Sequence, residues 1–203
     1  MDFERKYHWE NIYKTKAPNQ VSWTQIVPTI SLNFIRNCKL DKSAQIIDVG
    51  AGDSKLVDYL LADGFENITV LDISEKALEK AQKRLGKKAE QVNWIPCDIT
   101  TFKPEKPYDL WHDRAAFHFL TSDEQIKKYQ TIAKTWVKGY MVIGTFSTNG
   151  PTKCSGLEIK QYNKELLKGV FKNEFNIIES EQENHITPFN TSQNFIFCSF
   201  KKK

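Results

Sequence analysis

The sequence has few cysteines and no long apolar run, and each shortage excludes a class of protein. The cysteines are far apart, with no Cys-x-x-Cys pair and no histidine at metal-ligand spacing, and they are Cys38, Cys97, Cys154 and Cys198. This pattern predicts no zinc site. No apolar run of about 18 residues occurs, so no membrane-spanning helix is expected. Residues 1–10 are polar and charged, unlike a signal peptide, and we therefore expect a cytoplasmic protein with reduced thiols.

A strong surplus of one charge is also missing. The 203 residues carry a net charge of +4, and residues 201–203, all lysine, supply most of it. So small a charge gives no extended basic field, and no nucleic-acid partner is expected. In contrast, the sequence has 13 Phe, 7 Tyr and 5 Trp and is 40% hydrophobic. That composition is sufficient for one globular domain with a single core.

Short runs of β-branched and aromatic residues alternate with segments of helical spacing. The pattern predicts strands at 45–50, 68–73, 92–99, 108–113 and 140–146. It predicts helices at 55–64, 74–86 and 122–139, each closed by a glycine. Ser74 and Ser122 are the expected N-caps. Strands and helices in alternation indicate a parallel sheet that is covered on both faces.

The C-terminal part changes to a two-residue alternation. Strands are expected at 175–183 and 194–200, and the ten-residue connection between them is too short for a crossover helix. These strands should therefore form a hairpin. The predicted fold is α/β: a Rossmann-like, doubly wound, mostly parallel seven-stranded sheet with an antiparallel C-terminal hairpin. We expect a single globular domain, with the sheet in residues 41–203 and an N-terminal segment in residues 1–40.

A glycine-containing loop follows the first predicted strand. Gly50 and Gly52 allow a tight turn and a close approach of the backbone to a ligand. A dinucleotide-binding loop needs a small residue three positions later, but this position holds Lys55. Asp48, just before the glycines, would repel a pyrophosphate and suits a ligand with a cationic or amino group.

Two further acids end the next two predicted strands. Asp72 stands 22 residues after Gly50, where a carboxylate can accept both hydroxyls of a ribose. Asp98 ends the third strand in the same way. Together with Asp48, these acids predict one pocket rim, with Asp48 for an amino group, Asp72 for a ribose and Asp98 for the exocyclic amine of adenine.

Four segments carry a resemblance to a known family. They are DVGAGDS (48–54), VLDIS (70–74), PCDI (96–99) and YDLWHDRA (108–115). This series resembles the motifs of the class I S-adenosylmethionine-dependent methyltransferases, over roughly residues 40 to 200. The third glycine that is common in the first motif is replaced by Ser54. The resemblance implies S-adenosylmethionine as the methyl donor.

The resemblance also implies a set of cofactor-binding residues, which with Asp48 are Gly50, Gly52, Asp72, Ile73, Asp98, Ile99 and Asp113. In this set the glycines border the methionine part, and Asp72 binds the ribose. Asp98 and the backbone of Ile99 recognise adenine. Asp113 closes the floor beneath the sulfonium.

The N-terminal segment carries a second resemblance. Trp9, Tyr13 and Trp23 are similar to the Trp-x-x-x-Tyr and later Trp pattern of several small methyltransferases, including protein lysine methyltransferases that act on elongation factor. It implies that residues 1–40 form a helical lid and that these three aromatic residues contact the cofactor. Aromatic faces stabilise a nearby cation. The same spacing of Trp9 and Tyr13 also suits a helix that packs on the core.

The acceptor side is expected after the fourth and fifth predicted strands. The catalytic candidates are His112, Asp113 and His118, because a histidine can take a proton near neutral pH. The substrate-binding candidates are Arg114, Cys154 and Ser155. Three of these residues have an alternative: His118 as a structural histidine, Arg114 in an ion pair with Asp113 or another loop acid, and Cys154 as a passive thiol in the pocket wall. The loop at 185–193 is expected at the same rim.

The function favoured by these residues is methyl transfer from S-adenosylmethionine to a small-molecule acceptor. A protein lysine is the alternative acceptor, because of the resemblance at the N-terminus. A nicotinamide-dependent oxidoreductase fits less well, because Lys55, Asp98 and the terminal hairpin are not typical of it. A module that binds the cofactor without catalysis is the remaining alternative.

Overall fold

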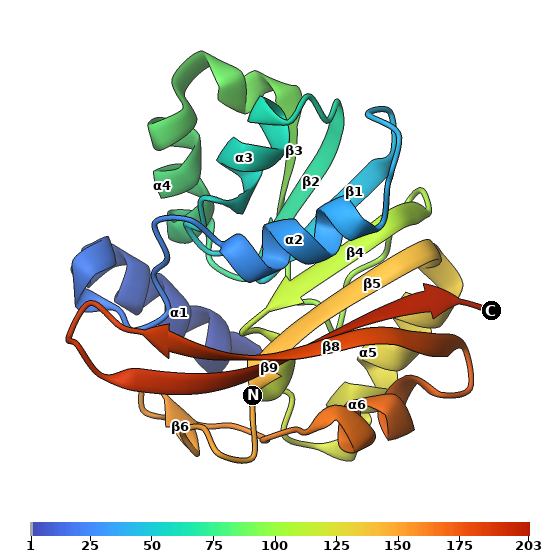
Figure 1. The fold of residues 1–203 in the computed structure, drawn as a ribbon. Coiled ribbons are helices and arrows are strands. Elements are labelled where there is room, and N and C mark those ends of the chain that lie inside the picture. Colours follow the sequence, from blue (N-terminus) through green and yellow to red (C-terminus); the bar gives the residue numbers. More distant parts are fainter. Residues whose placement is uncertain (1) are drawn as a thin grey trace.

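The computed structural model describes the backbone of residues 2–203 and the side chains of residues 4–203. One sheet has the strand order β3-β2-β1-β4-β5-β9-β8 (Figure 1). Its strands are β1 (Gln45–Val49), β2 (Asn67–Asp72), β3 (Val92–Pro96), β4 (Tyr108–Arg114), β5 (Val137–Phe146), β8 (Phe175–Ile186) and β9 (Ser192–Lys202). Strands β1 to β5 are parallel, whereas β9 pairs antiparallel with both β5 and β8. The predicted α/β sheet with an antiparallel C-terminal hairpin is confirmed.

Helices cover both faces of this sheet (Figure 1). The α-helices are α1 (Asp2–Thr15), α2 (Thr29–Asn37), α3 (Leu56–Ala62), α4 (Glu75–Leu85), α5 (Asp123–Trp136) and α6 (Lys164–Phe171). The short 3-10 helices are η1 (Pro18–Gln20), η2 (Gly86–Gln91) and η3 (Phe117–Phe119), and the small hairpin is β6 (Lys153–Cys154) with β7 (Leu157–Glu158). Buried residues of α2, α3 and α4 pack on one face, and those of α5 and α6 pack on the other.

The two-residue alternation of the strands decides which face each side chain reaches. In β4, Leu110 belongs to the core beneath α2 to α4, and Trp111 belongs to the core beneath α5 and α6. His112 therefore points to the α2 face, and Asp113 points to the α5 face. The same rule sends Asp48 of β1, which pairs with His112 in the register, to the α2 face.

The predicted helix starts are confirmed, but one predicted helix end is wrong. The Ser74 hydroxyl accepts the N–H of Ala77, and the Ser122 hydroxyl accepts the N–H of Gln125. However, α5 ends at Trp136, and Gly139 lies inside β5. The chain passes from helix to strand with no loop between them, so the glycine does not mark the end of the helix.

The C-terminal hairpin is longer than predicted. Strand β8 continues to Ile186 and β9 begins at Ser192, so the connection is 187–191 instead of ten residues. His185 and Gln193 face each other in the ladder and are not in a loop. Because this edge strand is largely polar, the sequence pattern predicted a strand that is shorter than the one observed.

Residues 1–40 contain two different structures. Helix α2 buries Leu32, Phe34 and Ile35 in the core, whereas α1 packs beside α4 (Figure 1). Helix α2 is thus part of the core, and the lid stays a prediction for α1 and the connection that follows it.

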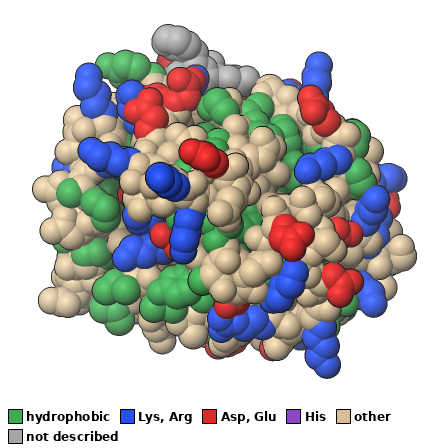
Figure 2. Space-filling model, turned by 90° about the horizontal axis from the view of Figure 1, so that it is seen from above, with side chains coloured by type: hydrophobic (Ala, Val, Ile, Leu, Met, Phe, Trp, Pro, Cys, Tyr) green, Lys and Arg blue, Asp and Glu red, His purple; other side chains and the backbone are tan. Residues whose placement is uncertain are grey.

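The surface agrees with the small net charge. On the face seen in Figure 2, Lys and Arg side chains lie among Asp and Glu side chains, with apolar groups between them. Within residues 2–203 no helix is long and apolar enough to cross a membrane.

Replacing Gly139 by alanine is expected to destabilise the protein. A Cβ atom at this position would lie 2.4 Å from the backbone oxygen of Asp109, which cannot move away without disturbing β4. We expect a loss of about 1–3 kcal/mol in the free energy of unfolding, measured by urea denaturation followed by tryptophan fluorescence. Gly169→Ala in α6 is the control: nothing lies within 4 Å of its Cβ position, and a gain of about 0.5–1 kcal/mol is expected. Equal stability of the two variants would contradict the packing of β4 and β5.

Candidate active site

A cavity of about 200 Å³ lies at the carboxyl ends of β1, β2 and β4, beneath α1. Most predicted site residues line it, namely Trp9, Tyr13, Trp23, Asp48, Gly50, Asp72, Ile73, Asp98, Ile99, His112, Arg114 and Cys154. The structure does not bring four others to its wall, namely Gly52, Asp113, His118 and Ser155. Open α/β sheets bind ligands at this edge, where the strand order reverses between β1 and β4.

Asp72 is a buried acid at the end of β2. Its Oδ2 accepts the N–H of Gly52 at 2.7 Å, and its Oδ1 accepts the N–H of Ser74 at 2.8 Å. Burial raises the pKa of this carboxyl to about 6, against the lowering effect of the two N–H donors. Gly52 thus contributes to the site by fixing the glycine loop to Asp72 rather than by lining the cavity.

The glycine loop requires its glycines. Gly50 and Gly52 have φ values of +62° and +58°, which side chains other than glycine rarely adopt. A Cβ atom at Gly50 would lie 2.2 Å from the Cβ of Ala116, and one at Gly52 would lie 2.1 Å from the hydroxyl of Tyr13. The loop is therefore enclosed between the start of η3 and α1.

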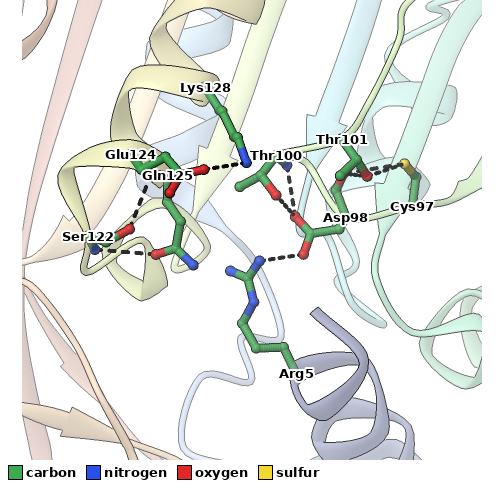
Figure 3. A network of polar contacts seen from close by, with 9 residues as sticks. All are labelled: Arg5, Cys97, Asp98, Thr100, Thr101, Ser122, Glu124, Gln125 and Lys128. Carbon is green, nitrogen blue, oxygen red and sulfur yellow. Dashed lines mark hydrogen bonds and ion pairs between the residues drawn. The ribbon is translucent and has the colours of Figure 1, made fainter. Parts of the chain in front are cut away.

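Asp98, the predicted adenine contact, is bound to α1 (Figure 3). Arg5 donates from Nη2 to Oδ2 of Asp98 at 2.5 Å, and the backbone and hydroxyl of Thr100 donate to Oδ1 at 2.8 and 2.7 Å. The ion pair is largely buried. One carboxylate therefore connects the cavity rim to the helix above it.

Glu10 holds α1 in place from the other side. Its carboxylate accepts the N–H groups of Glu75 at 2.7 Å and Lys76 at 3.2 Å, and the hydroxyl of Ser74 at 3.1 Å. These donors form the N-terminus of α4, which favours a negative charge. Helix α1 is thus docked on the same turn that Asp72 fixes.

Aromatic residues form the upper wall of the cavity. Trp9 packs edge-on against Trp23 and Phe119, with ring centroids 5.7 and 5.0 Å apart, and Tyr13 lies 6.3 Å from Trp23. The three predicted aromatic residues both line the cavity and pack on one another. The packing of these rings is thus observed, whereas their contact with the cofactor stays a prediction.

His112 and Asp48 form a buried chain with Ser31 of α2. Nδ1 of His112 donates to Oδ1 of Asp48 at 2.7 Å, and Nε2 lies 2.8 Å from the Ser31 hydroxyl. Both ring nitrogens are thus engaged, and no free nitrogen of His112 is presented to an acceptor. Asp48 likewise uses one oxygen inside the protein.

His118 lies outside the cavity wall, contrary to the position expected for a catalytic base. Its Nδ1 accepts the N–H of Phe146 at 3.2 Å. Burial lowers the pKa of His118 to about 3, with a further lowering by Arg114. The ring is therefore neutral, and the structure supports the alternative of a structural histidine.

Asp113 points away from the cavity, so it does not form the floor expected from the resemblance. Its Oδ1 accepts the N–H groups of Ala116 and Phe117 at 3.2 and 3.0 Å, and its Oδ2 accepts the hydroxyl of Tyr129 at 3.0 Å. Burial raises the pKa of Asp113 to about 6. The carboxylate fixes the turn after β4 and connects it to α5.

The predicted substrate-binding residues separate into two groups. Arg114 and Cys154 line the cavity, whereas Ser155 lies outside it, with φ +51° in the turn between β6 and β7. Burial raises the pKa of the Cys154 thiol to about 12, so it stays protonated and belongs to the wall. The alternative ion pair of Arg114 with Asp113 does not form, because Asp113 faces α5.

Sequence reasoning missed several cavity residues, of which Arg5 and Ser31 make the most specific contacts. Arg5 stands four residues before Trp9 and eight before Tyr13, so helical spacing places all three on one face of α1. That signal was present in the sequence. No such signal marked Ser31, whose role depends on the packing of α2.

Comparisons with known proteins show similarity to methyltransferases. Residues 46–139 match the model of the family described as "Methyltransferase domain". The eEF1A lysine and N-terminal methyltransferase of Bos taurus is 20% identical over 126 residues, which are 62% of this chain and 18% of that protein. This chain thus matches less than a fifth of the relative's length.

Solved structures share the fold over nearly the whole chain. A SAM-dependent methyltransferase from Anabaena variabilis has a TM-score of 0.78 and 13% identity, covering 100% of this chain and 95% of its own. The 1,6-didemethyltoxoflavin-N1-methyltransferase of Burkholderia thailandensis, solved with 1,6-didemethyltoxoflavin and S-adenosylhomocysteine, has a TM-score of 0.70 and 18% identity, covering 100% and 86%.

Fold and cavity together define a Rossmann-like domain with a cavity at the carboxyl edge of its sheet. Residues 46–139 are similar to a methyltransferase domain, and the whole chain has the fold of a solved SAM-dependent methyltransferase, a protein whose methyl donor is S-adenosylmethionine. The residues present fit this donor, because Asp72 and Asp98 offer buried carboxylate oxygens at successive strand ends of one cavity. Within residues 2–203 no group of three His, Cys, Asp or Glu side chains is placed to hold a metal ion.

The pKa of Asp72 predicts how cofactor affinity depends on pH. A ribose needs the ionised carboxylate as acceptor, so binding favours the ionised form. Because the pKa of Asp72 in the free protein is about 6, affinity for S-adenosylhomocysteine should be full above this pH. It should fall as the pH drops below 6, by up to about tenfold per unit.

The Asp72→Asn variant tests this dependence. It should bind S-adenosylhomocysteine about 1.5–3 kcal/mol more weakly and should lose most of the pH dependence, as measured by titration calorimetry. Asp63→Asn, which changes an exposed acid paired with Arg36, is the control. Wild-type affinity in Asp72→Asn would remove Asp72 from the site.

Asp113→Ala should separate a structural role from a catalytic one. The change leaves two buried N–H groups and one hydroxyl without an acceptor. We expect a loss of about 2–4 kcal/mol in the free energy of unfolding, measured in urea, with affinity for S-adenosylhomocysteine nearly retained in the folded variant. Full stability with lost affinity would return Asp113 to the cofactor site.

Proposed function

We propose that this chain transfers a methyl group from S-adenosylmethionine to a small-molecule acceptor. The observation that carries the proposal is the lack of a usable base among the predicted acceptor-side groups. Both ring nitrogens of His112 are engaged, His118 lies outside the cavity wall, and the thiol of Cys154 is protonated. An acceptor that needs no deprotonation by the protein fits such a site best.

A lysine acceptor would need more help than these residues offer. With a reference pKa of about 10.4, a lysine costs roughly 4.6 kcal/mol to deprotonate at pH 7. A carboxylic acid or an activated thiol is already ionised or nearly so. The lack of a residue that could deprotonate a lysine therefore favours such a small acceptor over a protein lysine.

Bound S-adenosylmethionine would supply a methyl group that is activated by a sulfonium. The residues of this chain bind and orient the reactants: Asp72 and Asp98 would hold the nucleoside, and the loop at 50–52 would border the methionine part. The aromatic residues and α1 cover one side of the cavity, where they would limit the access of water to the reactants. Orientation of the reactants alone can contribute about 7–11 kcal/mol to the acceleration.

Size and enclosure also support a small acceptor. The cavity is about 200 Å³, and α1 is fixed above it by the Arg5–Asp98 ion pair and by Glu10. The Burkholderia neighbour with the same fold is named for a small-molecule acceptor. A protein lysine remains the second candidate, because the bovine relative is a lysine methyltransferase.

Labelling of a cell lysate tests the acceptor class. The purified protein is incubated with lysate and S-adenosylmethionine that carries a radiolabelled methyl group. We expect label in the small-molecule fraction, and none with the Asp72→Asn variant, because that variant binds the donor poorly. Label in a protein band that depends on the active protein would support the lysine alternative. Titration with NAD in place of S-adenosylhomocysteine should give no binding.

A further inference from the structure

Arg114 lines the cavity and has a hydrogen-bonding edge that no described residue uses. Its Nη1 donates to the backbone oxygen of Trp23 at 3.0 Å, and its guanidinium carbon lies 4.7 Å from the centre of the Phe195 ring. Nε and Nη2 are buried and have no hydrogen-bond partner within the described residues. These two nitrogens form the side-on edge of a guanidinium, from which two N–H bonds point in parallel.

The side-on edge matches one chemical group especially well. A carboxylate can accept both parallel N–H bonds at once, and such paired bonds are among the strongest in proteins. Buried donors without an acceptor cost free energy, so an occupant with this shape would be favoured. Burial lowers the pKa of Arg114 to about 10, and the guanidinium is therefore still charged at neutral pH.

No acid among residues 4–203 hydrogen-bonds to this edge. Glu183 is the acid that most raises the pKa of Arg114, but it forms no ion pair with it, and its Oε1 accepts the side-chain N–H of Gln25 at 3.0 Å. Asp48 is bonded to His112. Glu183 is nevertheless the competing occupant, because its Oε2 also lacks a partner.

The surroundings of Arg114 describe the rest of the occupant. Phe119, Phe146 and Phe195 line the cavity together with Trp23, so the body of the ligand should be apolar. The acids Asp72 and Asp98 are at the end of the cavity predicted for the nucleoside. Arg114 comes from the end of β4, on the side predicted for the acceptor.

We propose that the methyl acceptor is a small molecule with an apolar body and a carboxylate, and that Arg114 binds this carboxylate side-on. The inference rests on the proposed function, because it assigns the acceptor half of the same cavity. Arg114 is then a specificity-determining residue that anchors the acceptor.

Paired probes test this assignment in the full chain saturated with S-adenosylhomocysteine. Benzoate, phenylacetate and hexanoate are each compared with the corresponding carboxamide by titration calorimetry. We expect at least one carboxylate to bind about tenfold or more tightly than its amide. Arg114→Gln should lose this preference while its affinity for S-adenosylhomocysteine stays within about twofold.

Two further variants complete the test. Arg114→Lys keeps the charge but not the parallel donors, and it should lose most of the preference. It also provides a result if Arg114→Gln does not fold. Glu183→Gln removes the competing occupant and should bind the carboxylates at least as well as the wild type.

Three results would overturn the inference. The first is equal binding of each acid and its amide, or no carboxylate binding up to about 10 mM. The second is an unchanged preference in the folded Arg114 variants. The third is a large loss of S-adenosylhomocysteine affinity in Arg114→Gln, which would assign the edge to the carboxylate of the cofactor. If the wild type does not bind S-adenosylhomocysteine at all, the proposed function itself fails, and the two failures are thus distinguishable.

Discussion

The buried carboxylate of Asp72 connects parts of the site that are far apart in the sequence. One oxygen holds the glycine loop through Gly52, and the other holds the first turn of α4 through Ser74. The same first turn of α4 donates hydrogen bonds to the carboxylate of Glu10 in α1. The loop, the helix and the cover of the cavity therefore all depend on one acid at the end of β2. Its raised pKa shows that burial outweighs the two N–H donors.

Much of this arrangement could be predicted from the sequence, because it depends on local patterns. Acids after buried strands lie at the same edge of a parallel sheet, and Asp48, Asp72 and Asp98 do line one cavity. Ser74 and Ser122 begin helices because their hydroxyls bind free N–H groups. The side-chain oxygen of Asn163 caps α6 by accepting the N–H of Leu166. The sequence therefore also contained an N-cap for this helix, which was not predicted.

Side-chain direction was harder to predict than position. Asp113 and Arg114 are neighbours in β4, yet Asp113 faces α5 and Arg114 faces the cavity. Alternation along the strand decides this, and it can be read only when the core on each face is known. The resemblance to a family placed Asp113 in the site by sequence position alone. The helix end predicted at Gly139 was wrong for a related reason. This glycine is required by its close packing against Asp109 of β4, which depends on the tertiary structure.

The distribution of charge in the cavity links the cofactor end to the acceptor end. Carboxylates line the end of the cavity where the nucleoside and the sulfonium are expected, and a cationic donor bound there would be stabilised by them. Arg114 has the opposite sign, and no acid among the described side chains hydrogen-bonds to its two free donors. An acceptor carboxylate would neutralise this cation without weakening the acids at the other end. The engaged ring nitrogens of His112 and the position of His118 outside the cavity wall likewise favour an acceptor that needs no base from these two residues.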